Sequence, residues 1–237
     1  MNPQRGEILC FNKPYTWTSF DLVNKVRGIL RHRTRNKKLK VGHAGTLDPL
    51  ATGVLVLCTG KKTKEIEQLQ THTKEYTATL QLGATTASYD LEHTVNHTYP
   101  TRHITRQLIE ETLPQFVGDI QQVPPTYSAV KVNGDRAYAL RRAGENVTLK
   151  PKSVRIDEIE LTHYDDETKQ LGLRVVCGKG TYIRSLARDL GRALGSGAFL
   201  TELRRTRVGD FTVDNCVSFK NFREWLEQQE IEDIHQV

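Results

Sequence analysis

The chain has 237 residues, of which 37% are hydrophobic and 26% charged, and it carries a net charge of +6. This composition excludes wholesale disorder, and no apolar run approaches the ~20 residues that span a bilayer or forms the core of a secretory signal. The excess of basic residues favours a polyanionic partner, and we expect a cytoplasmic, membrane-free protein.

The first half of the chain alternates between strand-like and helix-like patterns. Thr18 or Ser19 is the expected cap of the first helix, and Thr105 that of the second. The predicted elements are a strand over 8–11, a helix to residue 30 with Phe20, Val23, Val26 and Leu30 inward, a buried strand over 54–58, an alternating strand over 75–82 and a helix over 104–113.

The second half continues the same mixture. It predicts a strand over 130–132 before a tight Asn133-Gly134 turn, strands over 154–161 and 171–177, a helix over 183–194 stopped by Gly195, a strand over 208–213, and a last helix capped by Ser218 with Phe222, Trp225 and Leu226 inward. This order predicts an α+β fold around a mixed, largely antiparallel sheet flanked by helices. We expect a single catalytic domain over residues 1–237.

The cysteines and histidines indicate no metal site. None of the four cysteines belongs to a C-x-x-C pair, and Cys10, Cys58 and Cys177 lie in apolar runs, so we expect small buried side chains. The eight histidines are scattered, and glycine-rich nucleotide-binding motifs are missing. We therefore expect neither a metal nor a cofactor.

A basic segment, residues 27–40, contains seven lysines or arginines and no acid. Such a run is usually only a solvated face. Here it leads directly into the least ordinary stretch of the chain, which raises the prospect of contacts with nucleic-acid phosphates. The candidate RNA-binding residues of this segment are Arg33, Arg35, Lys37 and Lys38.

That stretch is GHAGTLDPLATG, from Gly42 to Gly53. Its glycines and small residues predict a tightly shaped loop, and the proline after Asp48 disfavours helical geometry at that residue. A turn in which the aspartate caps its own backbone is the simpler interpretation. The length of the distinctive string favours an active-site loop instead.

This loop resembles, almost residue for residue, the active-site loop of the TruB family of tRNA pseudouridine-55 synthases. Further stretches match the motifs of that family in order, although Thr16 stands where a glycine is usual. They are Lys13-Pro14 with Thr18-Ser19, Lys74-Glu75-Tyr76, Tyr127 to Lys131, Lys179 to Arg184, and Leu203-Arg204-Arg205. The resemblance therefore implies the pseudouridine synthase fold.

The resemblance implies three catalytic residues. Asp48 is the nucleophile, Arg184 is the cation that pairs with it and keeps it ionised, and Tyr76 packs on the target uracil and handles its C5 proton. From the pattern alone, Tyr76 also fits a core aromatic. Arg184 also fits a solvated helix stripe with Arg188 and Arg192, and we assign that solvated role to the latter two.

Other residues are implied to hold the substrate. His43 stacks against the RNA and fills the gap left by the flipped nucleotide, Tyr182 and Leu203 wall the base pocket, and Lys13 lies at the substrate. Lys131 belongs to an insertion, residues 124–151, that resembles the family's T-loop-gripping element. Residues 218–237 are expected to form only a C-terminal helix, without the accessory RNA-binding PUA domain.

The implied function is conversion of uridine 55 in the tRNA T-loop to pseudouridine by a cofactor-free monomer that binds the T-arm. One alternative is a non-catalytic RNA-binding or tRNA-folding protein on the same scaffold. A second is a nucleosidase acting on small molecules through Asp48. A third is an RNA-guided enzyme, which usually requires protein partners and an accessory domain.

Overall fold

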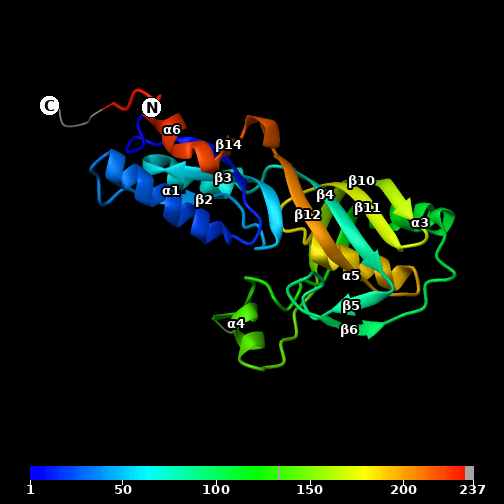
Figure 1. Ribbon diagram of the computed structural model, residues 1–237. Coiled ribbons are helices and arrows are strands. Elements are labelled where there is room, and N and C mark those ends of the chain that lie inside the picture. The colour runs from blue at the N-terminus through cyan, green and yellow to red at the C-terminus, as the bar shows by residue number, and fades with distance from the viewer. Residues whose placement is uncertain (133, 233–237) are drawn as a thin grey trace. The chain divides into compact units, whose positions relative to one another are not determined.

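The computed structural model describes residues 1–132 and 134–232, and the chain forms two compact units (Figure 1). Unit 1 comprises Met1–Glu75 and Arg204–Val237, and unit 2 comprises Tyr76–Leu203. The boundaries fall within two strands, β4 (Lys74–Leu82) and β12 (Ala198–Val208), so each strand contributes residues to both units. The single catalytic domain expected from the sequence stays a prediction.

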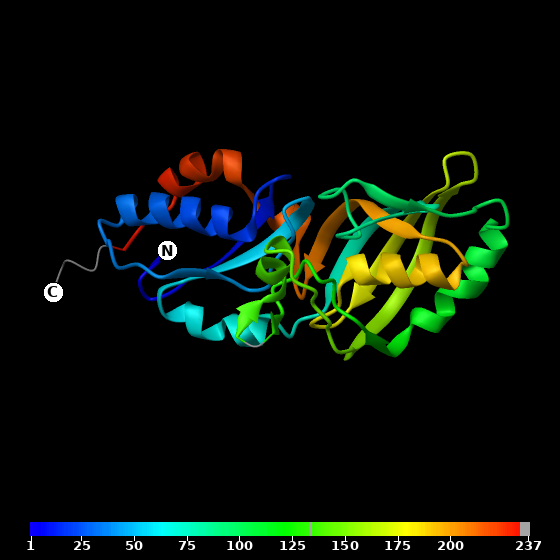
Figure 2. The ribbon, with the colours of Figure 1, turned by 90° about the horizontal axis from the view of Figure 1, so that it is seen from below.

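Unit 1 is built around β3 (Ala51–Thr59), which is buried at nearly every position. Helices α1 (Ser19–Arg33) and α6 (Phe222–Glu227) lie on one side of its sheet, and α2 (Ile66–Leu69) lies on the other (Figure 2). Strand β3 pairs in antiparallel fashion with β1 (Ile8–Lys13) and with β2 (Val41–His43). On the other side of β1 lies the parallel strand β14 (Val217–Ser218). The short strand β13 (Phe211–Thr212) pairs with the end of β12. Continuous burial of β3 follows from coverage on both faces.

Helix α1 begins with the predicted cap. Thr18 accepts from the backbone N–H of Asp21 at 3.0 Å, and Asp21 accepts in return from the N–H of Thr18 at 2.9 Å, which completes a capping box. The prediction that Phe20 faces inward is wrong, because its side chain is 59% exposed. The inward face is defined instead by Leu22, Val23, Val26 and Leu30 together with the buried Ser19, whose hydroxyl bonds the backbone of Leu47.

Unit 2 contains the strand order β4-β11-β10-β7, with α5 (Ile183–Ala193) packed against one face of the sheet (Figure 2). Strand β10 (Lys152–Asp165) is antiparallel to β11 (Gln170–Cys177) and to β7 (Gly118–Gln122). The remaining elements are α3 (Arg106–Thr112), α4 (Ala137–Arg142), the hairpin of β5 (Ala84–Thr86) with β6 (Val95–Thr98), and the hairpin of β8 (Lys131–Val132) with β9 (Asp135–Arg136). The mixed, largely antiparallel α+β fold is confirmed.

The predicted strand over 208–213 contains β13 and the last residue of β12, but the sequence did not predict the body of β12, which starts at Ala198. Its sequence from Arg204 to Arg207 is polar, so this part of the strand lacks the alternation that would predict it, and Arg205 is nevertheless buried. Ser218 does not cap the last helix. It precedes a 3-10 turn (Phe219–Asn221), and α6 follows directly. Asn133, half of the predicted turn, lies outside the described residues.

Two further expectations are corrected. Arg188 is only 6% exposed rather than solvated: it donates to the carbonyl of Val123 at 2.9 Å and pairs with Asp189 at 2.8 Å. Cys10 forms a disulfide with Cys216, whereas Cys58 and Cys177 are buried outside any disulfide, as expected. Within the described ranges, no helix has the length and apolar character needed to cross a membrane.

Helix α6 is anchored by Phe222, which is fully buried and meets the ring of Phe11 edge-on at 5.0 Å. We expect Phe222→Ala to lower the free energy of unfolding by about 3–5 kcal/mol, because it removes a buried aromatic and leaves a cavity. The matched control is Phe20→Ala, which should change it by less than about 0.5 kcal/mol. Urea unfolding of both variants tests this, and equal losses would contradict the burial pattern.

Candidate active site

The turn between β2 and β3, residues 44–50, carries Asp48 and is called the Asp48 turn below. Gly45 has a φ of +105°, a left-handed conformation that glycine adopts without strain, and the chain then doubles back into β3. In this geometry the turn's carbonyl oxygens have no neighbouring strand to bond. Carbonyls that are partly withdrawn from water need hydrogen-bond donors, and most of these donors come from other parts of unit 1.

Every carbonyl from Gly45 to Pro49 has such a donor. Arg205 donates to the oxygens of Gly45 and Thr46, the hydroxyl of Ser19 to Leu47, and the ammonium of Lys13 to Pro49, at distances of 3.1, 3.4, 3.0 and 3.1 Å. The oxygen of Asp48 itself accepts from the N–H of Ala51 at 3.1 Å. The backbone on both sides of the half-buried Asp48 side chain is therefore held in place.

Lys13 is completely buried at the end of β1. Its ammonium also donates to the carbonyls of Pro14 at 2.9 Å and Trp17 at 2.5 Å. Burial lowers the pKa of Lys13 to about 8; the charge of Asp48 acts in the opposite direction, and that of Arg205 adds to the lowering. Its donors serve backbone carbonyls, which favours a role in shaping the Asp48 turn; its predicted contact with substrate stays a prediction.

His43 ends β2, immediately before the Asp48 turn. Its Nδ1 is buried without a hydrogen-bond partner, and burial is the main cause of a lowered pKa for the imidazole. A nearby cation, Arg205, lowers that pKa further. The ring is therefore disposed to be neutral, which suits stacking on a base; that contact stays a prediction.

Arg184 lies in the first turn of α5 in unit 2 and is 4% exposed. Its Nε lies 3.6 Å from an oxygen of Asp90, and its Nη atoms donate to the carbonyls of Ser88 at 3.2 Å and Tyr127 at 3.0 Å. Asp90 is also buried and accepts from the Ser88 hydroxyl at 2.5 Å. Sequence reasoning missed Asp90, because a lone Asp in a polar loop gives no periodic or motif signal.

The other predicted residues of unit 2 occupy strand ends and the approach to α5. Tyr76 is 8% exposed and belongs to the alternating inward face of β4, as predicted. Tyr182 is half-buried, and its N–H donates to the side chain of Gln122 at 2.8 Å. Leu203 is half-buried on β12. These residues and Arg184 belong to unit 2 and Asp48 to unit 1, so their meeting at one site stays a prediction.

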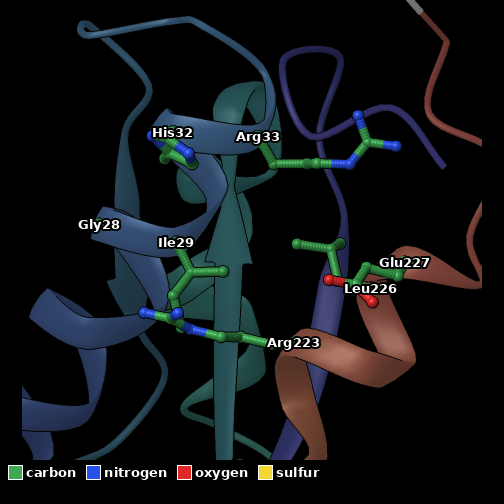
Figure 3. Close-up of a pocket in the computed structure, with 7 residues that line it drawn as sticks. All are labelled: Gly28, Ile29, His32, Arg33, Arg223, Leu226 and Glu227. Carbon is green, nitrogen blue, oxygen red and sulfur yellow. The ribbon is translucent and has the colours of Figure 1, made fainter.

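The basic segment ends α1 and continues into an irregular loop. Arg33, Arg35, Lys37 and Lys38 are exposed, while Arg31 secures the loop by donating to the carbonyl of Leu39 at 3.1 and 3.0 Å. Arg33 also lines a groove of about 420 Å³ between α1 and α6, toward which Arg223 extends from α6 (Figure 3). Lys131 is exposed on β8 in unit 2. The segment is therefore accessible to a polyanion.

Among residues 1–132 and 134–232, no group of three or more His, Cys, Asp or Glu side chains is arranged to hold a metal ion. The candidate catalytic side chains in the described residues are Asp48 on its hydrogen-bonded turn, the buried Arg184 and Tyr76.

Two family models match the chain. The model of the N-terminal domain of TruB family pseudouridylate synthases covers residues 31–183, and that of the C-terminal domain of tRNA pseudouridylate synthase B covers residues 184–236. The tRNA pseudouridine synthase B of Bacteroides thetaiotaomicron is 62% identical over 235 residues, 98% of this chain and 98% of that protein. The enzyme of the same name from Flavobacterium johnsoniae is 50% identical, covering 94% of this chain and 96% of that protein.

Solved structures show the same fold. A chain in the crystal structure of a Cbf5-Nop10-Gar1 complex superposes with a TM-score of 0.72 and 29% identity over 95% of this chain. A chain in the structure of an H/ACA RNP bound to a substrate RNA containing 2'-deoxyuridine gives 0.67 and 27% over 94%. The chain spans about half the length of these two, 56% and 54%.

The burial of Lys13 predicts a specific dependence of stability on pH. Between pH 8 and 10.5 the unfolded chain keeps the proton on Lys13 and the folded protein releases it, so this group's contribution to stability rises with pH across that window. The rise amounts to about 3 kcal/mol. Below pH 8 both states are protonated, and the contribution is constant.

Lys13→Met removes this titration. We expect the free energy of unfolding of the wild type, minus that of Lys13→Met, to increase by about 3 kcal/mol between pH 8 and 10.5. Urea unfolding of both proteins at several pH values measures the difference and cancels the titration of groups that they share. Parallel pH profiles would show that Lys13 has an ordinary pKa.

Proposed function

The chain belongs to the TruB family of pseudouridylate synthases and is an RNA pseudouridine synthase acting on tRNA, and we propose that it isomerises uridine 55 of the T-loop with Asp48 as nucleophile. The observation that carries the assignment to Asp48 is the turn whose hydrogen-bonded backbone bears this side chain. The T-loop target rests on the resemblance of the chain's motifs to those of the family.

The reaction is an isomerisation without a net change of oxidation state. The Asp48 carboxylate attacks the nucleoside and forms a bond to it as the bond between N1 and C1′ breaks. The base rotates, a bond forms between C5 and C1′, and the bond to Asp48 breaks, which releases the carboxylate. The proton on C5 is finally lost, and N1 gains one. A nucleophile fixed by its backbone enters this sequence without first losing conformational freedom, which is the source of the rate advantage.

The other catalytic assignments follow from what each side chain offers. Arg184, buried and already oriented by Asp90 and two carbonyls, supplies a desolvated cation that stabilises an ionised Asp48. Tyr76, on the inward face of β4, packs on the uracil and assists transfer of the C5 proton. Asp90 then acts as a positioning residue for Arg184.

A uridine inside a folded T-loop has to leave its stack before Asp48 reaches it. His43, at the entrance to the Asp48 turn, is proposed to fill the space left by the flipped nucleotide, while Tyr182 and Leu203 wall the base. The insertion 124–151, with Lys131 exposed, is proposed to grip the T-loop. Recognition of this kind depends on loop shape and stacking more than on paired sequence.

The basic segment is proposed to contact phosphates near the T-arm. Its four candidate cations are exposed, Arg33 at the end of α1 and the other three on the loop that Arg31 secures, so binding would not require the loop to be ordered first. Phosphate contacts fix the position of the RNA and carry no base information. The protein is proposed to act as a cytoplasmic monomer.

We expect Asp48→Asn to abolish pseudouridine formation and to leave tRNA binding close to that of the wild type. Asparagine is nearly isosteric and keeps the backbone of the turn, but its amide is a poor nucleophile. Mapping of pseudouridine at nucleotide resolution on an unmodified tRNA transcript, together with a binding titration, tests both halves. Product formed by a sequence-verified Asp48→Asn preparation would refute the assignment; modification of a different uridine would refute the target only.

Replacing Arg33, Arg35, Lys37 and Lys38 with glutamine should flatten the dependence of log K for tRNA on log salt concentration. Each lost phosphate contact removes roughly 0.7–0.9 from the slope, so the quadruple variant should lose up to about three units. The affinities of tRNAs of different sequence should fall alike.

The control replaces the exposed Arg102 and Arg106 of unit 2 with glutamine. This change lowers the positive charge without touching the basic segment, and its slope should match the wild type. If the quadruple variant also keeps the wild-type slope and binds normally at ~0.15 M salt, where the Debye length is ~8 Å, the segment acts through long-range attraction only.

A further inference from the structure

Among the residues that the structure describes, the largest fully buried side chain is that of Arg205 on β12, which is 1% exposed. Its Nε donates to the carbonyl of Val54 in β3 at 2.8 Å, and its two Nη atoms donate to the carbonyls of Gly45 and Thr46. One planar guanidinium therefore ties Val54, the fourth residue of β3, to Gly45 and Thr46, which precede Asp48 in the turn. A fork of fixed geometry holds three acceptors in one arrangement, which a flexible ammonium does not.

The position of Arg205 is itself fixed by close packing of the backbone. A Cβ atom on Gly53 would lie 2.1 Å from the carbonyl oxygen of Arg205, so only glycine lets the two strands approach this closely. Gly53 also has a φ of +102°, which disfavours any other residue there. The last glycine of the GHAGTLDPLATG stretch therefore places the arginine against the turn.

From these contacts we propose that Arg205 is the positioning residue for Asp48: its guanidinium holds the N-terminal arm of the Asp48 turn so that the carboxylate is presented in its reactive orientation. Ser19 and Lys13 hold the centre and the C-terminal arm through Leu47 and Pro49. Only Arg205 holds two successive carbonyls, those of Gly45 and Thr46, and its loss would free that arm while the others stay bound.

The proposal rests on Asp48 being the nucleophile. It predicts that loss of Arg205 lowers the rate of the reaction and leaves the affinity for tRNA unchanged. A displacement of the nucleophile by about 1 Å costs on the order of 100-fold in rate. We therefore expect Arg205→Lys, which keeps the charge but loses the fork, to lower the single-turnover rate at saturating tRNA about 100-fold. The dissociation constant for tRNA should stay near the wild-type value, because the guanidinium is buried.

The control is Arg207→Gln. Arg207 lies two residues further along β12, on the same side of the strand, and its guanidinium contacts Glu75 and the carbonyl of Gly209 rather than the Asp48 turn. Its single-turnover rate should remain close to that of the wild type. A comparable loss of rate in this control would show that any damage to β12 disturbs catalysis, which would overturn the proposal.

Amide hydrogen exchange provides a second readout that does not depend on the chemistry. In Arg205→Lys, exchange should accelerate in the peptide covering residues 44–52 while β1 and the body of β3 keep their protection. Uniformly faster exchange across unit 1, or wild-type exchange and rate in the folded variant, would overturn the proposal. If Asp48→Asn were active but exchange in Arg205→Lys still rose only in the turn, the assignment of the nucleophile would have failed and the structural part of the inference would stand.

Discussion

The carbonyl oxygens of a tight, partly buried turn need hydrogen-bond donors, and in this protein that requirement organises the candidate active site. Five successive carbonyls, from Gly45 to Pro49, draw donors from β1, the start of α1, β3 and β12. Elements that are distant in the sequence thus converge on one short turn. The turn cannot change conformation without breaking its hydrogen bonds to these elements, so the backbone of Asp48 is held by the surrounding structure.

Two of these donors are buried cations, an arrangement that proteins normally avoid. Desolvation of an ammonium or guanidinium is costly, and the lowered pKa of Lys13 is one expression of that cost. The cost is offset because charged donors bond the carbonyls strongly and because Asp48 carries the opposite charge nearby.

Arg184 in unit 2 illustrates the same principle with a different partner. Its charge is shared between Asp90 and two carbonyls, so the guanidinium is oriented before any substrate binds. Arg188, one helical turn later, is equally buried but is engaged by Asp189 and Val123. Arg184 and Arg188 therefore share one sequence pattern but have different partners. Those partners, and not the pattern, distinguish the two arginines.

The sequence alone determined the family, the α+β class, most of the elements and the candidate residues. Periodicity reports which face of a strand or helix is buried, as for β4, and a long distinctive string such as GHAGTLDPLATG reports a loop of fixed shape. The sequence did not reveal the burial of Arg205, the partner of Arg184, the exposure of Phe20 or the start of β12. The first three depend on contacts between residues far apart in the chain. Arg205 contacts Gly45, Arg184 contacts Asp90, and Ser19 contacts Leu47, so that the polar Ser19 and not Phe20 faces inward. Local pattern carries no information about such partners, so only the tertiary structure decided where these charges are satisfied.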